Sequence, residues 1–598
     1  MYFLEGRVER ILSDLEHLIC TESREITNLQ VRYGQVTKPL NPTSIENNWQ
    51  DYVAGTPWAE AVSDEYALFR TSLEIPAEFG GKKVVLRVKT NKAGWQPLNP
   101  QMLIYVNGQE YQGLDRNHHI VLLTDKGQPG ATYDVLIHAF SGLGRNFDSD
   151  DDGNAVKLFI NLETIDPEIE GFYYDLKTAL QVVSQLPKAS IEQVRLLEVL
   201  NETVNQLDLR IPYSKSFYKA LQRARDYLQK HVYQRPQTPT GMVTCVGHTH
   251  IDVAWLWRYS HTREKVVRSF STVLQLMEEY PEFGFMSSQP QLYEYIKEDH
   301  PHVYARIKER IKEGRWEAEG GMWVEPDVNI PSGESLVRQF LLGKRFFKEE
   351  FGVDSRILWL PDVFGYSAAL PQIMKKSGVD YFMTAKLRNN EFNEFPYHTF
   401  MWRGIDGSEV LSHLTLYCPS FQNALIDKGD IIDSWNNYRH KDFNDDVLLT
   451  YGYGDGGGGP TREMVETLKR YEHGFPGVPA ARPGKALDYF QELEERVAGN
   501  KRLPTWVGEL YYEVHRGTYT SMARNKKYNR KAEFLYTTAE WIATLRKLLL
   551  GTFYPWEELH NGWKGILLNQ FHDVLPGSSI KEVYDDTDEI YHQVFATG

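Results

Sequence analysis

The segment 242-MVTCVGHTHIDVAWLW-257 starts as an apolar run and then turns polar, with His250 and Asp252 close behind the run. An apolar run of this length, bounded by polar residues, is typical of a buried strand. The same order recurs in 356-RILWLPDVFGYS-367 and in 446-DVLLTYGYGDGGGG-459. Because parallel α/β folds form active sites at the carboxyl ends of their strands, we expect these three loops to open on one side of a sheet.

Strand-like and helix-like segments alternate around these loops, which predicts repeated β-α units and a mostly parallel sheet, open or closed into a barrel. We expect strands at 242–247, 283–288, 315–321, 356–360, 380–387, 409–417 and 446–452, with helices at 264–280, 302–314 and 334–352.

The rest of the chain changes periodicity several times, so the predicted fold class is multidomain α/β. Short apolar runs separated by turn residues indicate an N-terminal β-sandwich, in which Asn107-Gly108 forms a hairpin turn. The expected order is an N-terminal helix at 1–24, the β-sandwich at 25–165, a helical linker region at 166–240, a (β/α) barrel-like catalytic domain at 241–520 and a helical bundle domain at 521–598, with helices at 529–550 and 555–574.

Composition narrows the classes of partner. The 598 residues carry a formal charge of -15, which argues against nucleic acid because such binding depends on clustered Lys and Arg. A neutral or polar substrate fits better, and 14 Trp and 35 Tyr provide flat surfaces on which a sugar can stack. Cys20, Cys245 and Cys418 are too scattered for a disulfide framework, and no apolar run is long enough to cross a bilayer. The first residues do not form a signal-peptide core, so we expect a cytoplasmic protein.

The spacing of His250 and Asp252 suits a metal site. With one residue between them, both side chains can face one ion if the segment is extended, and imidazole with carboxylate suits a borderline cation such as zinc. His248 would point the same way, as a third ligand or as a partner of a ligand. The alternative is an ordinary polar loop that holds no metal.

Asp362 and Asp455 are the candidate catalytic carboxylates. Asp362 follows a buried strand, where an unpaired carboxylate is costly, so it needs a cation, strong donors or a raised pKa; an ordinary helix N-cap is the alternative. Asp455 lies among glycines that let the backbone approach a ligand, although flexible Gly-rich connections are common.

The segment 568-LNQFHDVLPGSS-579 places His572 and Asp573 near the end of an apolar helix. A histidine in such a position is usually a core or capping residue. Taken with the other motifs, however, the chain offers a His/Asp metal set and two further carboxylates. Glycoside hydrolysis uses such a pair, one as nucleophile and the other as acid/base.

Six segments resemble the signature segments of glycoside hydrolase family 38, the α-mannosidases, and in particular its cytosolic and bacterial branch. They cover the chain from about Gly241 to its end in the family's order. The segments are 247-GHTHIDVAWLW-257, 320-GGMWVEPDVNIPSGESLVRQ-339, 359-WLPDVFGYS-367, 451-YGYGDGGGGPT-461, 508-GELYYEVHRGTYTS-521 and 569-NQFHDVLPGSS-579. Family members normally continue into β-rich domains, which this chain, ending at Gly598, is expected to lack.

The resemblance implies one zinc ion held by His250, Asp252, Asp362 and His572. In the family, zinc contacts the 2- and 3-hydroxyls of the mannose and helps to distort the ring toward an oxocarbenium-like state. Asp362 would attack the anomeric carbon and form a covalent mannosyl-enzyme, which water opens with net retention. Asp455 is the candidate acid/base, although other members have two adjacent aspartates where this chain has Asp455-Gly456.

By the same resemblance, Trp255 and Phe364 form an aromatic wall under the sugar, and Asp573 accepts a hydrogen bond from a hydroxyl. A further set of residues could contact the substrate or the residues around it. An ordinary structural role is the alternative for each of them. This set contains Asp327, Lys386, Arg388, Glu513, His515, Arg516 and Tyr519.

The leading hypothesis is therefore a zinc-dependent, retaining exo-α-mannosidase that hydrolyses terminal α-linked mannose from oligosaccharides, without nucleic acid or membrane as partner. A homo-oligomer is compatible with the sequence, which sets neither the linkage preference nor the metal. A metal-dependent carbohydrate deacetylase is a second hypothesis, because His-x-Asp sites at strand ends also activate water. A mannoside-binding protein without catalysis is a third.

Overall fold

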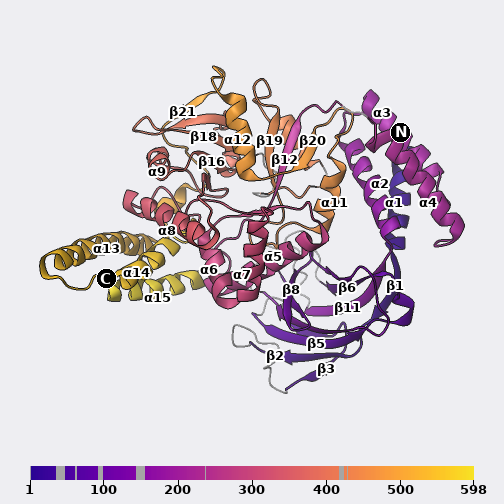
Figure 1. Cartoon of the computed structure of the whole chain (residues 1–598), viewed down its shortest axis with the longest axis horizontal. Helices are drawn as coiled ribbons and strands as arrows, with labels where there is room; N and C mark the ends of the chain where they lie inside the picture. The colour runs from indigo at the N-terminus through magenta and orange to yellow at the C-terminus, as the bar shows by residue number, and fades with distance from the viewer. Residues whose placement is uncertain are drawn as a thin grey trace.

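The computed structural model of the chain (Figure 1) describes residues 2–35, 48–60, 64–91, 99–142, 155–235, 238–415, 423–426 and 429–598. In the view of Figure 1, the N-terminal strands (indigo) lie at the lower right, the C-terminal helices (yellow) at the lower left, and the remaining sheets above them.

The N-terminal part contains two antiparallel sheets that share one hydrophobic core. Apolar residues at alternate positions, such as Leu86 and Ile160, face this core because side chains on a strand alternate between faces. The predicted hairpin turn is present, with φ of 52° at Asn107 and 80° at Gly108. One sheet has the order β1-β11-β6-β9 with β4 on β11, and the other β3-β2-β5-β10-β7-β8. The strands are β1 (Cys20–Glu25), β2 (Leu29–Tyr33), β3 (Gln50–Tyr52), β4 (Pro57–Ala59), β5 (Tyr66–Glu74), β6 (Lys83–Thr90), β7 (Gln101–Val106), β8 (Gln109–Leu114), β9 (Ile120–Thr124), β10 (Thr132–Phe140) and β11 (Val156–Ile165).

In the described chain, the helices before and after the N-terminal strands pack against one another, and the first of them contacts β1. Helix α1 (Tyr2–Ile19) packs against α2 (Pro167–Gln185) and α3 (Ile191–Asn205), and α4 (Lys215–Leu228) packs against α2 and α3. The prediction of a helix over 1–24 was wrong at its end, because the chain from Cys20 pairs with β11 as β1. Asp166 caps α2 by accepting hydrogen bonds from the backbone N–H groups of Glu168 and Ile169.

Two further sheets form the central part, and most of their strand pairs are parallel, as predicted. One has the order β14-β13-β12-β19 with β20 on β12, and the other β15-β16-β18-β17-β21. Among the described strands of these two sheets, only β17 and β18 pair in antiparallel fashion, and a parallel bridge between Gly320 and Leu358 joins the two sheets. The strands are β12 (Met242–His248), β13 (Phe285–Ser287), β14 (Trp316–Ala318), β15 (Ile357–Trp359), β16 (Tyr381–Thr384), β17 (Thr399–Arg403), β18 (Glu409–Leu414), β19 (Asp446–Tyr451), β20 (Ala480–Pro483) and β21 (Thr505–Val507).

Helices connect the parallel strands, and α5 also packs against β7 and β8 of the N-terminal part. The strand predicted over 380–387 ends at Thr384, because the chain leaves the sheet in a 3-10 turn, η3 (Lys386–Asn389). Leu387 is nevertheless buried, so the apolar pattern continues past the end of the strand. The helices are α5 (Tyr259–Glu279), α6 (Pro290–Asp299), α7 (Pro301–Lys312), α8 (Gly333–Phe351), α9 (Leu370–Lys376), α10 (Asp430–Asn437), α11 (Arg462–Arg470) and α12 (Ala486–Val497).

The last part of the described chain contains α13 (Ala523–Leu550), α14 (Trp556–Leu568) and α15 (Lys581–Thr597), which pack around Tyr536 and Trp563. The helix predicted over 555–574 ends at Leu568, so His572 lies in the turns that follow α14. The apolar pattern misleads here because Phe571 and neighbouring residues remain buried after the helix ends.

In the part of the chain that the structure describes, we find no helix that is both long and apolar enough to span a membrane. Cys20 and Cys245 are free thiols, and Cys418 lies outside the described residues.

Candidate active site

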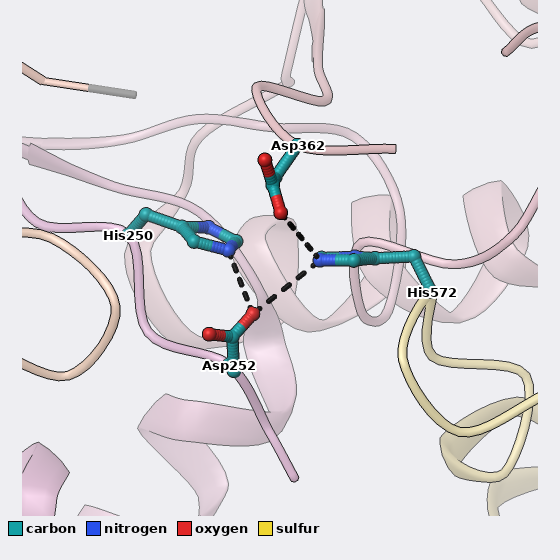
Figure 2. Close-up of side chains that lie close together, drawn as sticks. All are labelled: His250, Asp252, Asp362 and His572. Atoms are coloured by element: carbon teal, nitrogen blue, oxygen red, sulfur yellow. Dashed lines mark hydrogen bonds and ion pairs between the residues drawn. The ribbon is translucent and has the colours of Figure 1, made fainter. Parts of the chain in front are cut away.

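Four of the predicted metal ligands form one buried cluster. His250, Asp252, Asp362 and His572 each offer one ligand atom, and these atoms all lie within 4.8 Å of one another (Figure 2). The separations are 2.8 Å from His250 Nε2 to Asp252 Oδ1, 3.4 Å from His572 Nε2 to Asp252 Oδ1 and 3.7 Å from His572 Nε2 to Asp362 Oδ2. Ligands about 2.1 Å from a tetrahedral ion lie about 3.4 Å apart, so this spacing suits one cation.

The ends of two parallel strands supply three members of the cluster. His250 and Asp252 follow β12, and Asp362 follows β15. In an extended segment, residues separated by one position point to the same face, which directs His250 and Asp252 together. Their convergence therefore follows from the positions of two strand ends in the joined parallel sheets.

A separate backbone pairing brings in His572 from the end of α14. Pro326 and Phe571 form an antiparallel bridge, and Asp327 N donates to the carbonyl of Gln570 at 2.9 Å. This pairing sets His572 beside Glu325, whose carbonyl oxygen lies 2.7 Å from His572 Nδ1. The segment after β14 thus anchors the loop that carries the fourth candidate ligand, His572.

The protonation of His572 fits a metal ligand. A carbonyl oxygen only accepts, so its short contact with Nδ1 places the proton there and leaves the lone pair of Nε2 facing the cluster. His572 is fully buried, and among the described residues its Nε2 has no hydrogen-bond partner. A buried polar atom without a partner is costly, and a cation coordinated at this position would satisfy it.

The charges of the cluster also require compensation. Burial disfavours a charged His250, yet Asp252 and Glu325, one at each ring nitrogen, raise its pKa well above the usual value. Burial would raise the pKa of Asp252, but His250 and His572 lower it overall. The site thus holds carboxylates ionised in the interior, where charges are stable only when paired or bound to metal.

Asp362 has a second partner outside the ligand set. Its Oδ1 lies 2.6 Å from Lys386 Nζ, while its Oδ2 faces His572. Burial alone would raise the pKa of Asp362, but Lys386, His250 and His572 outweigh it and lower the pKa. The turn η3 after β16 places Lys386 for this contact, so Asp362 is held as a carboxylate.

The Gly-rich loop after β19 lies against the end of β12. Gly456 N donates to the carbonyl of His250 at 3.1 Å, and a Cβ at Gly452, where φ is 134°, would overlap the carbonyl of His248. The glycines are therefore needed because the backbone of this loop packs closely against the backbone at the end of β12. Burial, together with Asp252 and Asp362, raises the pKa of Asp455 to about 8.

Phe364 and Asp573 border the cluster. The Phe364 ring stands nearly perpendicular to that of His572, with centroids 5.7 Å apart, and Lys386 Nζ lies 5.1 Å from its centroid. Asp573 Oδ2 is 3.7 Å from His572 Nε2, and its Oδ1 accepts a hydrogen bond from Ser578. Burial, with Asp252 and Asp362 nearby, raises the pKa of Asp573 to about 7.

Comparison with known proteins places this arrangement in a family. The model of the glycosyl hydrolases family 38 N-terminal domain matches residues 240–509, and that of the alpha mannosidase middle domain matches residues 513–598. Alpha-mannosidase G of Dictyostelium discoideum is 34% identical over 98% of this chain and 54% of its own length. The chain belongs to glycosyl hydrolase family 38.

Other relatives align over similar spans. The alpha-mannosidase of Saccharomyces cerevisiae is 35% identical over 93% of this chain and 51% of its own length. Alpha-mannosidase 2C1 of Homo sapiens is 35% identical over 99% of this chain and 56% of its own length. The chain thus spans about half the length of these relatives.

Among solved structures, an alpha-mannosidase from Enterococcus faecalis is similar in fold. It aligns with 60% of this chain and 41% of its own, with a TM-score of 0.53 at 22% identity. This alignment shows a similar fold over the aligned part of the two chains.

His248, which the sequence left as a ligand or a partner, does not belong to the ligand cluster of this family 38 chain. Its Nε2 accepts a hydrogen bond from Trp359 Nε1 at 3.1 Å, and its Nδ1 lies 3.0 Å from Asn423 Oδ1. Both ring nitrogens are thus occupied, and burial lowers the pKa of His248 to about 4. A neutral His248 supports the end of β12 beneath the ligands.

Trp255 and His515 pack against residues that in turn contact candidate ligands, Trp257 beside Asp252 and Phe364 beside His572. Trp255 is half-buried, with its ring 5.8 Å from that of Trp257. The His515 ring packs perpendicular to Phe364 at 4.5 Å.

The other residues predicted to contact the substrate form hydrogen bonds within the chain, mainly around Asn329 and Glu513. Asp327 accepts from the N–H groups of Asn329 and Ile330, and Tyr519 accepts from the Asn329 side chain. Glu513 accepts from the backbone and side chain of Asn393, and its carbonyl accepts from Arg516. Arg388 is half-buried at the end of η3.

Sequence reasoning missed Glu325, which contacts both histidines of the cluster. Its Oε2 lies 2.9 Å from His250 Nδ1, and its carbonyl accepts from His572 Nδ1. The available signal was its place in the motif 320-GGMWVEPD-327, after a buried strand and before a proline. A carboxylate in that position satisfies the rule by which Asp362 was found.

Proposed function

We propose that this chain carries the active site of a zinc-dependent, retaining exo-α-mannosidase that removes terminal α-linked mannose from oligosaccharides. One observation carries the proposal: Asp362 directs Oδ2 toward the ligand cluster, 3.7 Å from His572 Nε2, and Oδ1 toward Lys386 Nζ at 2.6 Å. Asp362 is thereby held ionised at the edge of a cation site, as an attacking carboxylate requires.

The substrate class rests on the relatives. The proteins named above from Dictyostelium, yeast and human are α-mannosidases. Because this chain spans about half of their length, the activity of the whole protein belongs to the proposal. A cytoplasmic location is also proposed, with the free thiols of Cys20 and Cys245 in support.

His250, Asp252, Asp362 and His572 would hold the ion. We favour zinc because two imidazoles and two carboxylates suit its coordination chemistry. When bound, the ion supplies Lewis-acid polarisation of the hydroxyl oxygens of the sugar.

Two carboxylates divide the chemistry. In the first step an oxygen of Asp362 forms a bond to the anomeric carbon while the glycosidic C–O bond breaks, and Asp455 gives its proton to the leaving oxygen. In the second step Asp455 takes a proton from water, whose oxygen bonds to the anomeric carbon and releases Asp362. The raised pKa of Asp455, about 8, keeps its proton available at neutral pH.

Neighbouring side chains would orient the sugar. Phe364 and Trp255 would provide aromatic surfaces for its apolar face, and Asp573 would accept a hydrogen bond from a hydroxyl. Lys386, Arg388, Glu513, His515 and Tyr519 are proposed as outer contacts with the substrate.

Hydrolysis of 4-nitrophenyl α-mannoside, followed by proton NMR of the first sugar released, tests this function. The proposal predicts α-mannose, and it predicts that a mechanism-based fluoromannoside labels the peptide that contains Asp362. Asp362→Asn should lose on the order of a thousandfold or more in kcat. First release of the β-anomer, or release of acetate from acetylated sugars without mannoside cleavage, would contradict it.

A further inference from the structure

Glu325 is the one residue that contacts the outer nitrogen of both histidines in the described cluster. Its side-chain Oε2 lies 2.9 Å from Nδ1 of His250, and its carbonyl oxygen lies 2.7 Å from Nδ1 of His572. The same carbonyl also accepts from His572 N at 3.3 Å. Glu325 does not itself belong to the group of ligand atoms, so its contacts lie behind the histidines.

The position of Glu325 is fixed by neighbours that also support the ligands. Its Oε1 accepts a hydrogen bond from Ser288 Oγ at 2.6 Å, and its N donates to Gln289 Oε1 at 3.1 Å. Gln289 Nε2 in turn donates at 2.9 Å to the carbonyl of Ile251, between two of the ligands. Gln289 has φ of 62°, an uncommon conformation for a residue other than glycine, and these two bonds hold it there.

We propose that Glu325 is a positioning residue that holds the proton of each imidazole on Nδ1, so that Nε2 of both His250 and His572 faces the metal ion. The Glu325 carbonyl accepts from His572 Nδ1 and the Glu325 carboxylate lies 2.9 Å from His250 Nδ1, so each oxygen favours the tautomer with its proton on Nδ1 and the ring orientation that presents Nε2 to the ion. Metal-binding histidines commonly depend on such partners, whose loss typically weakens metal binding about 10-fold to 100-fold. The inference rests on the proposed metal site and adds one residue that serves two ligands through two different groups.

Zinc affinity, measured by competition with a chelating indicator, tests the side-chain contact. Glu325→Ala should raise the zinc Kd about 10-fold to 100-fold, because His250 loses the carboxylate that lies 2.9 Å from its Nδ1. The metal-free variant should keep the circular dichroism spectrum of the wild type. The inference would be overturned if folded Glu325→Ala protein had a zinc Kd within about twofold of the wild-type value.

Glu319→Gln provides a matched control. Glu319 is as buried as Glu325, at 1% and 2% exposure, but it accepts from the backbone N–H groups of Arg356 and Ile357 and contacts neither histidine. We expect its zinc Kd to match that of the wild type. An equal loss in Glu319→Gln and Glu325→Ala would indicate a general effect of removing a buried carboxylate and would contradict a specific role for Glu325.

A measurement on the unmodified protein covers the case in which Glu325→Ala does not fold. In protein labelled with nitrogen-15 histidine and loaded with cadmium-113, the inference predicts coupling of the metal to Nε2 of His250 and His572, with a proton on both Nδ1 atoms. Coupling through either Nδ1 would overturn it. Wild-type protein that binds no zinc would refute the proposed function itself, whereas normal zinc binding with the wrong tautomer would refute only the role of Glu325.

Discussion

Lys386 Nζ lies 2.6 Å from Asp362 Oδ1, and the two residues are 9% and 7% exposed. The Lys386 ammonium group helps to lower the pKa of Asp362. Asp362 is the proposed nucleophile and must be ionised to react. Activity that depends on the ionised Asp362 is present above this pKa and is lost as the pH falls through this pKa. Lys386→Met should therefore move the acid limb of the kcat/KM profile upward by about 1 to 3 pH units.

Lys375→Met is the control for that shift. Lys375 Nζ pairs with Asp380 Oδ1 at 2.5 Å, but the pair is partly exposed, so its loss should leave the profile unchanged. An acid limb that does not move in Lys386→Met would show that the ammonium group does not set the ionisation of Asp362.

Asp455→Asn should separate the acid step from nucleophilic attack. With a substrate whose leaving group needs protonation, we expect a loss of about 10²-fold to 10⁴-fold, whereas a dinitrophenyl mannoside should still form the mannosyl-enzyme rapidly. Added azide should then restore turnover and yield the α-mannosyl azide. Equal losses with both substrates, and no effect of azide, would remove Asp455 from the acid/base role.

The pH profile supplies a second check on Asp455. Its pKa is raised to about 8, so the protonated acid is present below that pH and is lost as pH rises through the pKa. A cation bound nearby would lower the pKa of Asp455 from this raised value, which places the alkaline limb at or below about pH 8. Asp455→Asn should abolish this limb, which can be followed as kcat/KM against pH.

His118 links the N-terminal sheets to the Gly-rich loop. Its Nδ1 lies 3.0 Å from Asp115, and its Nε2 donates to the carbonyl of Pro460 at 3.1 Å. His118→Ala should remove the imidazole partner of the partly buried Asp115 carboxylate, which keeps the backbone N–H donors of residues 117 and 118, and should destabilise the fold by about 1–3 kcal/mol, measurable as a lower urea midpoint. His119, the next residue, is half-buried, and His119→Ala should lower the stability clearly less. Equal losses of stability in the two variants would contradict the pairing of His118 with Asp115.

Gly562 tests the packing of the C-terminal helices. A Cβ there would overlap the ring of Tyr536, which belongs to the core of α13, α14 and α15. Gly562→Ala should destabilise the protein by about 1–3 kcal/mol, visible in thermal unfolding. Gly333→Ala, in α8 with open space around the added methyl, should be neutral or stabilising by up to about 1 kcal/mol.

The sequence predicted the parts of the site that depend on local order. His250 and Asp362 each follow an apolar run, and the ends of parallel strands meet, so their proximity could be inferred without coordinates. The hairpin turn at Asn107-Gly108 was equally local. In each case the decisive residues are neighbours in the chain.

Other parts depend on contacts between distant segments. His572 reaches the site because residues 325–327 pair with residues 570–572, and no periodicity in either segment indicates that pairing. The role of Glu325 could not be predicted for the same reason, because its contact with His572 is made by its backbone carbonyl group. The helix predicted through residue 574 also failed here, because burial of Phe571 continues the apolar pattern beyond α14.

The metal content of the purified protein tests the central claim most directly. We predict one zinc ion per chain in the wild type and none in His572→Ala, with both proteins folded, because His572 supplies one of only four proposed ligands. Chelation should abolish hydrolysis of the aryl mannoside, and added zinc should restore it. A metal-free wild type that hydrolyses the mannoside at full rate, or His572→Ala with full zinc content, would contradict the account.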